Sequence, residues 1–211
     1  MNIKSCRLGV GLLRINMIIL AVVTALQLAL AIVILCLPST VDSALNFIRI
    51  VSLAIIIAAI AASVINLIGY ILGLRADRYF LAALLISLLP IIVMVINIFL
   101  DDTSAAASIL DTVSGFSGTL ALIFAVFALI RVSGTLGDGE AEHSGNLLLS
   151  QIALLLFLSV TFSMIASLNL GASTVPNTVF SIASDAVSVL LYVILAVYFS
   201  KIRKLLKKQP K

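Results

Sequence analysis

Six long runs of apolar residues divide the chain, and short polar or charged segments separate them. Each run holds about 20 to 25 residues, and at about 1.5 Å rise per residue such a helix crosses the ~30 Å hydrocarbon core of a bilayer. The runs do not alternate apolar and polar residues, as the strands of a membrane barrel do. The pattern predicts six transmembrane helices, over residues 15–37, 50–74, 79–100, 109–130, 147–170 and 178–200.

Prolines and polar residues predict where these helices bend or end. Pro90 lacks a backbone N–H and predicts a kink in the third helix. Residues 132–146 are rich in Gly, Ser and acidic residues and predict a loop. The sixth helix is expected to continue into a short cytoplasmic basic tail, 201–211. The predicted fold class is therefore an all-α integral membrane protein, a single transmembrane helical domain over residues 1–211.

The composition supports this class. Hydrophobic residues make up 63% of the chain and charged residues 10%, and the mean hydropathy is +1.30. A soluble domain carries about 25% charged residues, so a water-soluble fold is excluded. The first apolar run is longer than the core of a signal peptide and lacks a small-x-small cleavage site, so we expect it to be retained. Cys6 and Cys36 lie at opposite ends of that helix and are not expected to pair.

The basic residues fall on one side of the six-helix topology. Of the basic residues, only Arg49 lies on the opposite side. Because Lys and Arg near span ends remain in the cytoplasm, both termini are expected to be cytoplasmic and the protein to lie in the plasma membrane. The basic residues on the cytoplasmic side are Lys4, Arg7, Arg14, Arg75, Arg78, Arg131, Lys201, Arg203, Lys204, Lys207, Lys208 and Lys211.

The second predicted helix carries a row of small residues at spacings of four and three. Such a row occupies about a third of the helix circumference and lets another backbone approach closely, which is how helices associate in lipid. We expect the seam from Ala58 to Gly73 to pack against a neighbouring helix or a membrane partner helix. The row consists of Ala54, Ala58, Ala62, Asn66, Gly69 and Gly73.

Asp185 is the one acidic residue that the helix register places within the hydrocarbon, about 24 Å beyond Lys201. Arg49 and Asp111 are expected near the outer interface. Two interpretations stay open. These three residues line an outward-facing polar cavity for a solute or ion, or Asp185 is hydrated or paired with Arg49 and orders the bundle. The same face of the sixth helix carries three serines, Ser181, Ser184 and Ser188.

A second polar group is expected near mid-membrane. It comprises Gln27, Asn66 and the carbonyl that Pro90 leaves without a donor. These groups either coordinate a substrate or form interhelical hydrogen bonds of about 0.6 kcal/mol each.

The remaining polar residues predict no catalytic chemistry. The single histidine, His143, lies among acidic and glycine residues in the predicted loop, without the second His or Cys of a metal motif. No nucleophile is paired with a base, so we expect neither an enzyme nor a bound metal or cofactor. The C-terminal tail interleaves Ile202, Leu205 and Leu206 with cations. It suits anionic lipid headgroups at about 1 kcal/mol per cation, or it serves only to fix the topology. No nucleic-acid partner is expected.

Two resemblances follow from short segments. The hairpin turn from Leu74 to Ala83, LRADRYFLAA, resembles turns in uncharacterised multi-span bacterial membrane proteins, and this implies no activity. Ala21, Ala25 and Ala29 have the Ala-x-x-x-Ala spacing seen on the first helix of the substrate-binding subunits of energy-coupling-factor vitamin transporters. That resemblance implies a six-helix protein with both ends cytoplasmic that binds a small solute.

Two function classes therefore remain. The first is a non-catalytic accessory or structural membrane subunit whose helix seams bind partners. The second is a small-solute binding or transport protein. A polar cavity reaching Asp185 would favour the second class, and a tightly packed bundle the first.

Overall fold

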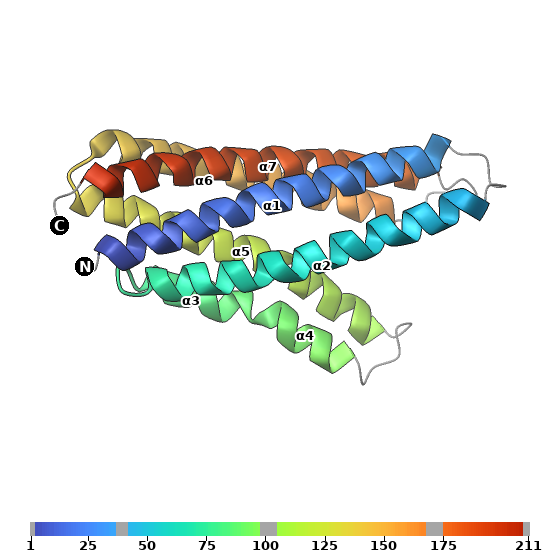
Figure 1. Cartoon of the computed structure of the whole chain (residues 1–211), viewed down its shortest axis with the longest axis horizontal. Helices are drawn as coiled ribbons and strands as arrows, with labels where there is room; N and C mark the ends of the chain where they lie inside the picture. The colour runs from blue at the N-terminus through green and yellow to red at the C-terminus, as the bar shows by residue number, and fades with distance from the viewer. Residues whose placement is uncertain (1–2, 37–41, 98–104, 168–174, 209–211) are drawn as a thin grey trace. The chain divides into compact units, whose positions relative to one another are not determined.

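A computed structural model describes residues 3–36, 42–97, 105–167 and 175–208. Within these ranges the chain is α-helical apart from short turns, and no β-strand occurs in them. This confirms the all-α class. The helices of the described part are α1 (Ile3–Cys36), α2 (Asp42–Gly73), α3 (Tyr79–Ser87), α4 (Leu89–Asn97), α5 (Ala105–Thr135), α6 (Gly139–Ser167) and α7 (Val175–Lys208) (Figure 1).

Five of these helices are long and apolar enough to cross a membrane. A shorter apolar segment, Tyr79–Val93, corresponds to the third predicted span. The described part of the chain thus contains the six predicted apolar segments, as five long helices and one interrupted helix. The five long apolar segments are Ile3–Val33, Ile48–Gly73, Phe116–Thr135, Gly139–Ser159 and Val179–Lys208.

The kink predicted at Pro90 is a complete break between α3 and α4. Leu88 lies between the two helices and donates its N–H to the carbonyl of Leu85 at 3.3 Å. The N–H groups of Ile91 and Ile92 both donate to the Leu88 carbonyl at 3.1 Å. Pro90 is the second residue of α4. Its missing N–H costs no hydrogen bond there, because the first turn of a helix has no intrahelical acceptor for it.

The helices extend beyond the apolar runs. α1 begins at Ile3, twelve residues before the predicted start at Ile15, and α7 continues to Lys208. An α-helix satisfies its own backbone hydrogen bonds and can therefore project from hydrocarbon into water. The apolar runs therefore predict which residues would lie within a membrane, but they do not predict where each helix begins and ends.

The loop predicted over residues 132–146 is wrong, because only three residues separate α5 from α6. Gly137 has φ +74°, and its N–H donates to the Gly134 carbonyl at 3.1 Å. The Asp138 N–H donates to the Ser133 carbonyl at 3.2 Å, which completes a Schellman motif. Asp138 then caps α6, since its Oδ1 accepts the N–H of Ala141 at 2.9 Å. The Gly and acidic residues mark helix ends here.

The chain forms two compact units, and neither is a continuous stretch of sequence. The first unit comprises Met1–Leu12, Leu67–Leu149 and Lys201–Lys211, and the second comprises Leu13–Asn66 and Ser150–Ser200. In the first unit α5 packs beside α3 and α4 (Figure 1). In the most apolar stretch of α5, 56% of the residues are buried, whereas in the most apolar stretch of α2 only 11% are. α5 therefore supplies much of the core of the first unit.

The glycine end of the α2 seam packs against α1 in the first unit. A Cβ atom placed on Gly9 would lie 2.7 Å from the Gly69 carbonyl oxygen and 3.1 Å from the Gly73 nitrogen. The two backbones are therefore in direct contact, which confirms the close helix approach predicted for this end of the seam. Further along α2, Ala62 is 1% exposed.

The opposite face of α2 is an exposed apolar stripe. Its large side chains recur every three or four residues, as on one face of a helix. An exposed stripe of this length is typical of a helix in contact with lipid or with another helix. The exposed residues are Ile50, Leu53, Ile56, Ile57, Ile60, Val64, Ile68 and Ile71.

Candidate functional site

Three serines connect α6 to α7 in the second unit. The hydroxyls of Ser159 and Ser184 lie 2.9 Å apart, and Ser184 also donates to the Ser159 carbonyl at 3.2 Å. Ser188 donates to the Ser184 carbonyl at 3.0 Å, and its hydroxyl lies 3.5 Å from that of Ser159. Ser184 is 8% exposed. Two of the predicted serines therefore form an interhelical hydrogen-bond cluster, while Ser181 is exposed.

Asp185 lies beside this cluster on α7 and is half-buried. Within the described residues, which include both side chains, no ion pair or hydrogen bond joins Asp185 to Arg49. Arg49 is exposed on α2. The predicted Arg49–Asp185 pair is therefore not formed. Asp111 falls in α5, and its side chain lies outside the described residues.

Among the described residues, no hydrogen bond joins the two side chains predicted at mid-membrane. Gln27 is exposed on α1, whereas Asn66 is half-buried on α2. The Asn66 Oδ1 atom is buried and has no hydrogen-bond partner among the described residues. Burying such a group without a donor costs about 1–3 kcal/mol.

Asn16 is a buried polar residue that the sequence analysis missed. It is 1% exposed on α1, and its Oδ1 atom has no hydrogen-bond donor within the described part of the chain. The sequence signal was present, because Asn16 lies in an otherwise apolar run. The predicted helix begins at Ile15 and so places Asn16 at a membrane boundary, whereas α1 begins at Ile3 and Asn16 lies inside a packed helix.

An ion pair joins the α2–α3 turn to α5 in the first unit. Arg131 Nε lies 3.4 Å from Asp77 Oδ2, and the Arg131 guanidinium lies 5.3 Å from the centre of the Tyr79 ring. The other Asp77 oxygen accepts the Tyr79 N–H at 2.9 Å. Because Arg131 is half exposed, this contact contributes little beyond holding the turn in place.

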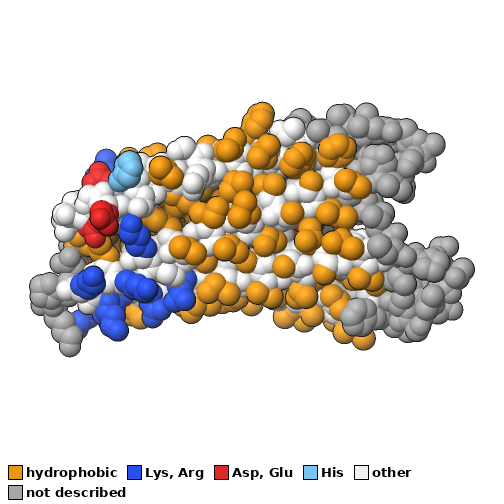
Figure 2. Space-filling view, turned by 90° about the horizontal axis from the view of Figure 1, so that it is seen from above, with side chains coloured by type: hydrophobic (Ala, Val, Ile, Leu, Met, Phe, Trp, Pro, Cys, Tyr) orange, Lys and Arg blue, Asp and Glu red, His pale blue; other side chains and the backbone are white. Residues whose placement is uncertain are grey.

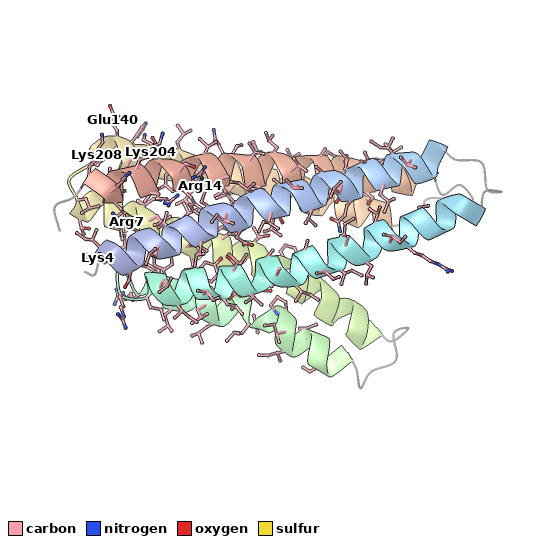
Figure 3. All side chains as sticks on the ribbon, in the orientation of Figure 1. Lys4, Arg7, Arg14, Glu140, Lys204 and Lys208 are labelled. Carbon is pink, nitrogen blue, oxygen red and sulfur yellow. The ribbon has the colours of Figure 1, made fainter. Side chains whose placement is uncertain are left out.

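A shallow polar cavity of about 420 Å³ lies where the α5–α6 turn meets the end of α7. Its polar lining includes Asp138, Glu140 and Lys208, and its apolar lining Leu136 and Leu205. Figure 3 shows Glu140 at the start of α6 and Lys208 near the end of α7. One Asp138 oxygen is already used to cap α6.

The exposed end of this unit is predominantly basic. On the face shown in Figure 2, Lys and Arg side chains gather in one area, with a few acidic side chains and His143 beside them. His143 is exposed on α6 and does not lie in a loop. Among the described residues, no group of three or more His, Cys, Asp or Glu side chains is arranged to hold a metal ion.

The C-terminal tail is part of the packed structure of the first unit. Residues 201–208 are helical, and Ile202 and Leu206 are 0% and 1% exposed. The Lys201 ammonium donates to the Ser144 hydroxyl of α6 at 2.8 Å. Ile202 and Leu206, two of the three apolar side chains expected to alternate with cations at a lipid surface, are therefore buried in protein, while Leu205 is half-buried and the cations remain exposed.

No protein-family model matches this chain, and no curated protein or solved structure was found to be similar to it.

Proposed function

We propose that this chain is a multi-pass protein of the plasma membrane with both termini in the cytoplasm, and that it acts as a non-catalytic accessory or structural subunit. The observation that carries the proposal is which segments of the chain the first unit contains. It contains the start of α1, the α2–α3 turn, the α5–α6 turn and the end of α7.

These are the four segments that the charge pattern assigns to the cytoplasm. An even number of membrane crossings lies between each of them and the next, so a hairpin topology brings them to one side. Ten basic residues of this unit belong to the described part, namely Lys4, Arg7, Arg75, Arg78, Arg131, Lys201, Arg203, Lys204, Lys207 and Lys208.

The topology is tested by labelling single cysteines. After replacement of Cys6 and Cys36, a membrane-impermeant thiol reagent should label Ser104→Cys on intact cells. His143→Cys, at an exposed site on α6, should react only after the membrane is opened. The reverse pattern, or equal labelling of both, would contradict the proposed topology.

The accessory role rests on how the polar side chains are used. The Ser159 and Ser184 hydroxyls bond each other, and Ser188 donates to the Ser184 carbonyl. Arg131 of α5 pairs with Asp77 of the α2–α3 turn. Such contacts position helices relative to one another. The exposed α2 stripe supplies a surface for lipid or a partner helix.

A second candidate function is small-solute binding, and the buried Asn16 favours it. An amide oxygen buried without a donor is a group that a ligand donor could satisfy. Asn66 presents a second such oxygen on α2. The half-buried carboxylate of Asp185 lies beside the serine cluster, in the same unit as Asn16 and Asn66.

Substitution of Asn16 separates the two candidates. If Asn16 is only packed, Asn16→Leu removes an unsatisfied oxygen and should leave the free energy of unfolding unchanged or raise it by up to about 1–3 kcal/mol. The melting temperature in detergent should then stay the same or rise. The control Gln27→Leu changes an exposed residue of the same helix and should have little effect. If Asn16→Leu alone lowers the melting temperature, Asn16 makes a polar contact and the solute-binding candidate gains support.

A further inference from the structure

α1 and α7 are in contact in the first unit, where Arg203 lies across Gly11. A Cβ atom on Gly11 would lie 3.3 Å from Arg203 Nε and 3.7 Å from its Cζ. Gly11 is buried although it carries no side chain, because the arginine covers it. The glycine thus provides the space in which the Arg203 side chain rests against α1.

Two further cations lie at one level beyond this contact. α1 begins and α7 ends in the first unit, so the helices run in opposite directions there (Figure 1). Arg7 precedes Gly11 by four residues on α1, and Lys207 follows Arg203 by four residues on α7. Each is displaced from the Gly11–Arg203 contact by about 6 Å in the same direction. Lys4 lies one turn further along the same face of α1, and Figure 3 shows Lys4 and Arg7 at that end of the helix.

No acidic residue of either helix balances these charges. α1 contains no Asp or Glu, and the acidic residue of α7, Asp185, belongs to the second unit. The first unit does place acids beside α7, but at the cavity where Glu140 and Asp138 lie with Lys208. The described residues of the α1–α7 contact thus bring like charges together without an ion pair. Like charges at this spacing repel one another weakly, and a bound anion would relieve that repulsion.

We propose that Arg7, Arg203 and Lys207 form a binding site for the phosphate of an anionic phospholipid headgroup at the cytoplasmic surface. The site rests on the proposed function, because a headgroup reaches this level only if the helices span the membrane. One guanidinium group can donate two parallel hydrogen bonds to the oxygens of a phosphate, and an ammonium group adds a point charge. Basic clusters between transmembrane helices on the cytoplasmic side recognise anionic headgroups in this way.

The test measures how lipid shifts the thermal unfolding of the full chain in uncharged detergent. Phosphatidylglycerol should raise the melting temperature by several degrees, and neither phosphatidylcholine nor soluble glycerol phosphate should do so. Arg203→Gln and Lys207→Gln should each reduce the shift by at least half. Gly11→Leu should reduce it as well without changing any charge, because the new side chain displaces Arg203.

The matched control is Lys208→Gln, which removes one charge from the same turn of α7 on the side of the α6 cavity, and should keep the full shift. An equal loss in Lys208→Gln would overturn the site in favour of general attraction by the tail. An equal effect of phosphatidylcholine or of glycerol phosphate would also overturn it. Cysteine labelling distinguishes the two proposals, since an unchanged labelling pattern without a lipid shift refutes only the headgroup site.

Discussion

Gly9→Leu is expected to destabilise the protein strongly. Even the first carbon of a side chain would meet the Gly69 carbonyl oxygen at 2.7 Å and the Gly73 nitrogen at 3.1 Å. Both atoms belong to the backbone of α2 and cannot move aside as a flexible side chain does. Overpacking a tight contact costs about 1–3 kcal/mol and occasionally more, and we expect the upper end of that range here.

The matched control is the same substitution at Gly118 of α5, where an added Cβ meets no atom within 4 Å. Gly118→Leu should stabilise the helix by up to about 1 kcal/mol, because leucine has the higher helix propensity. Circular-dichroism melting in detergent should therefore shift in opposite directions for the two variants. Equal shifts would mean that the α1–α2 contact is looser than the structure indicates.

Ile202→Ala and Leu206→Ala should each lower the free energy of unfolding by about 2–4 kcal/mol. Both side chains are almost fully buried in the first unit. Truncation removes apolar contacts and leaves a cavity that the helices can fill only in part. Thermal melting in detergent, where no bilayer is present, measures this loss directly.

Lys204→Ala is the control for the tail, because Lys204 is exposed on the same helical turn. It should change stability by no more than about 0.5 kcal/mol. If all three variants melt like the parent protein, the tail is not packed and its apolar residues serve a lipid surface, as the sequence alone suggested.

The number and placement of the apolar helices could be predicted from the sequence, because each long run of apolar residues between charged or polar segments corresponds to one apolar helical segment. Helix ends could not be predicted in this way. The end of α5 and the start of α6 depend on Gly137 in a left-handed conformation and on the Asp138 cap. Those residues resemble a flexible loop when they are read by composition alone.

Contacts between polar residues depend on which helices pack side by side. The apolar runs do not indicate which helices are neighbours. Ser184 and Ser188 were identified from the face of α7, but their partner Ser159 is on α6, 25 residues earlier than Ser184. Arg49 was paired with Asp185 by membrane depth alone, although depth says nothing about direction around a helix. Gly9 was not singled out, because its importance arises only where α2 approaches it.

The discontinuous first unit has a consequence for synthesis of the protein. Residues 201–208 belong to the same unit as Leu67–Leu149, yet the ribosome adds them later. At roughly 5–20 residues per second, about 3 to 12 s pass between translation of Leu149 and of Lys208. During that interval the surface later covered by Ile202 and Leu206 is open to insertion factors and proteases. The unit is therefore completed only after residues 201–208 have been translated, and a premature stop before residue 202 would leave it incomplete in every copy.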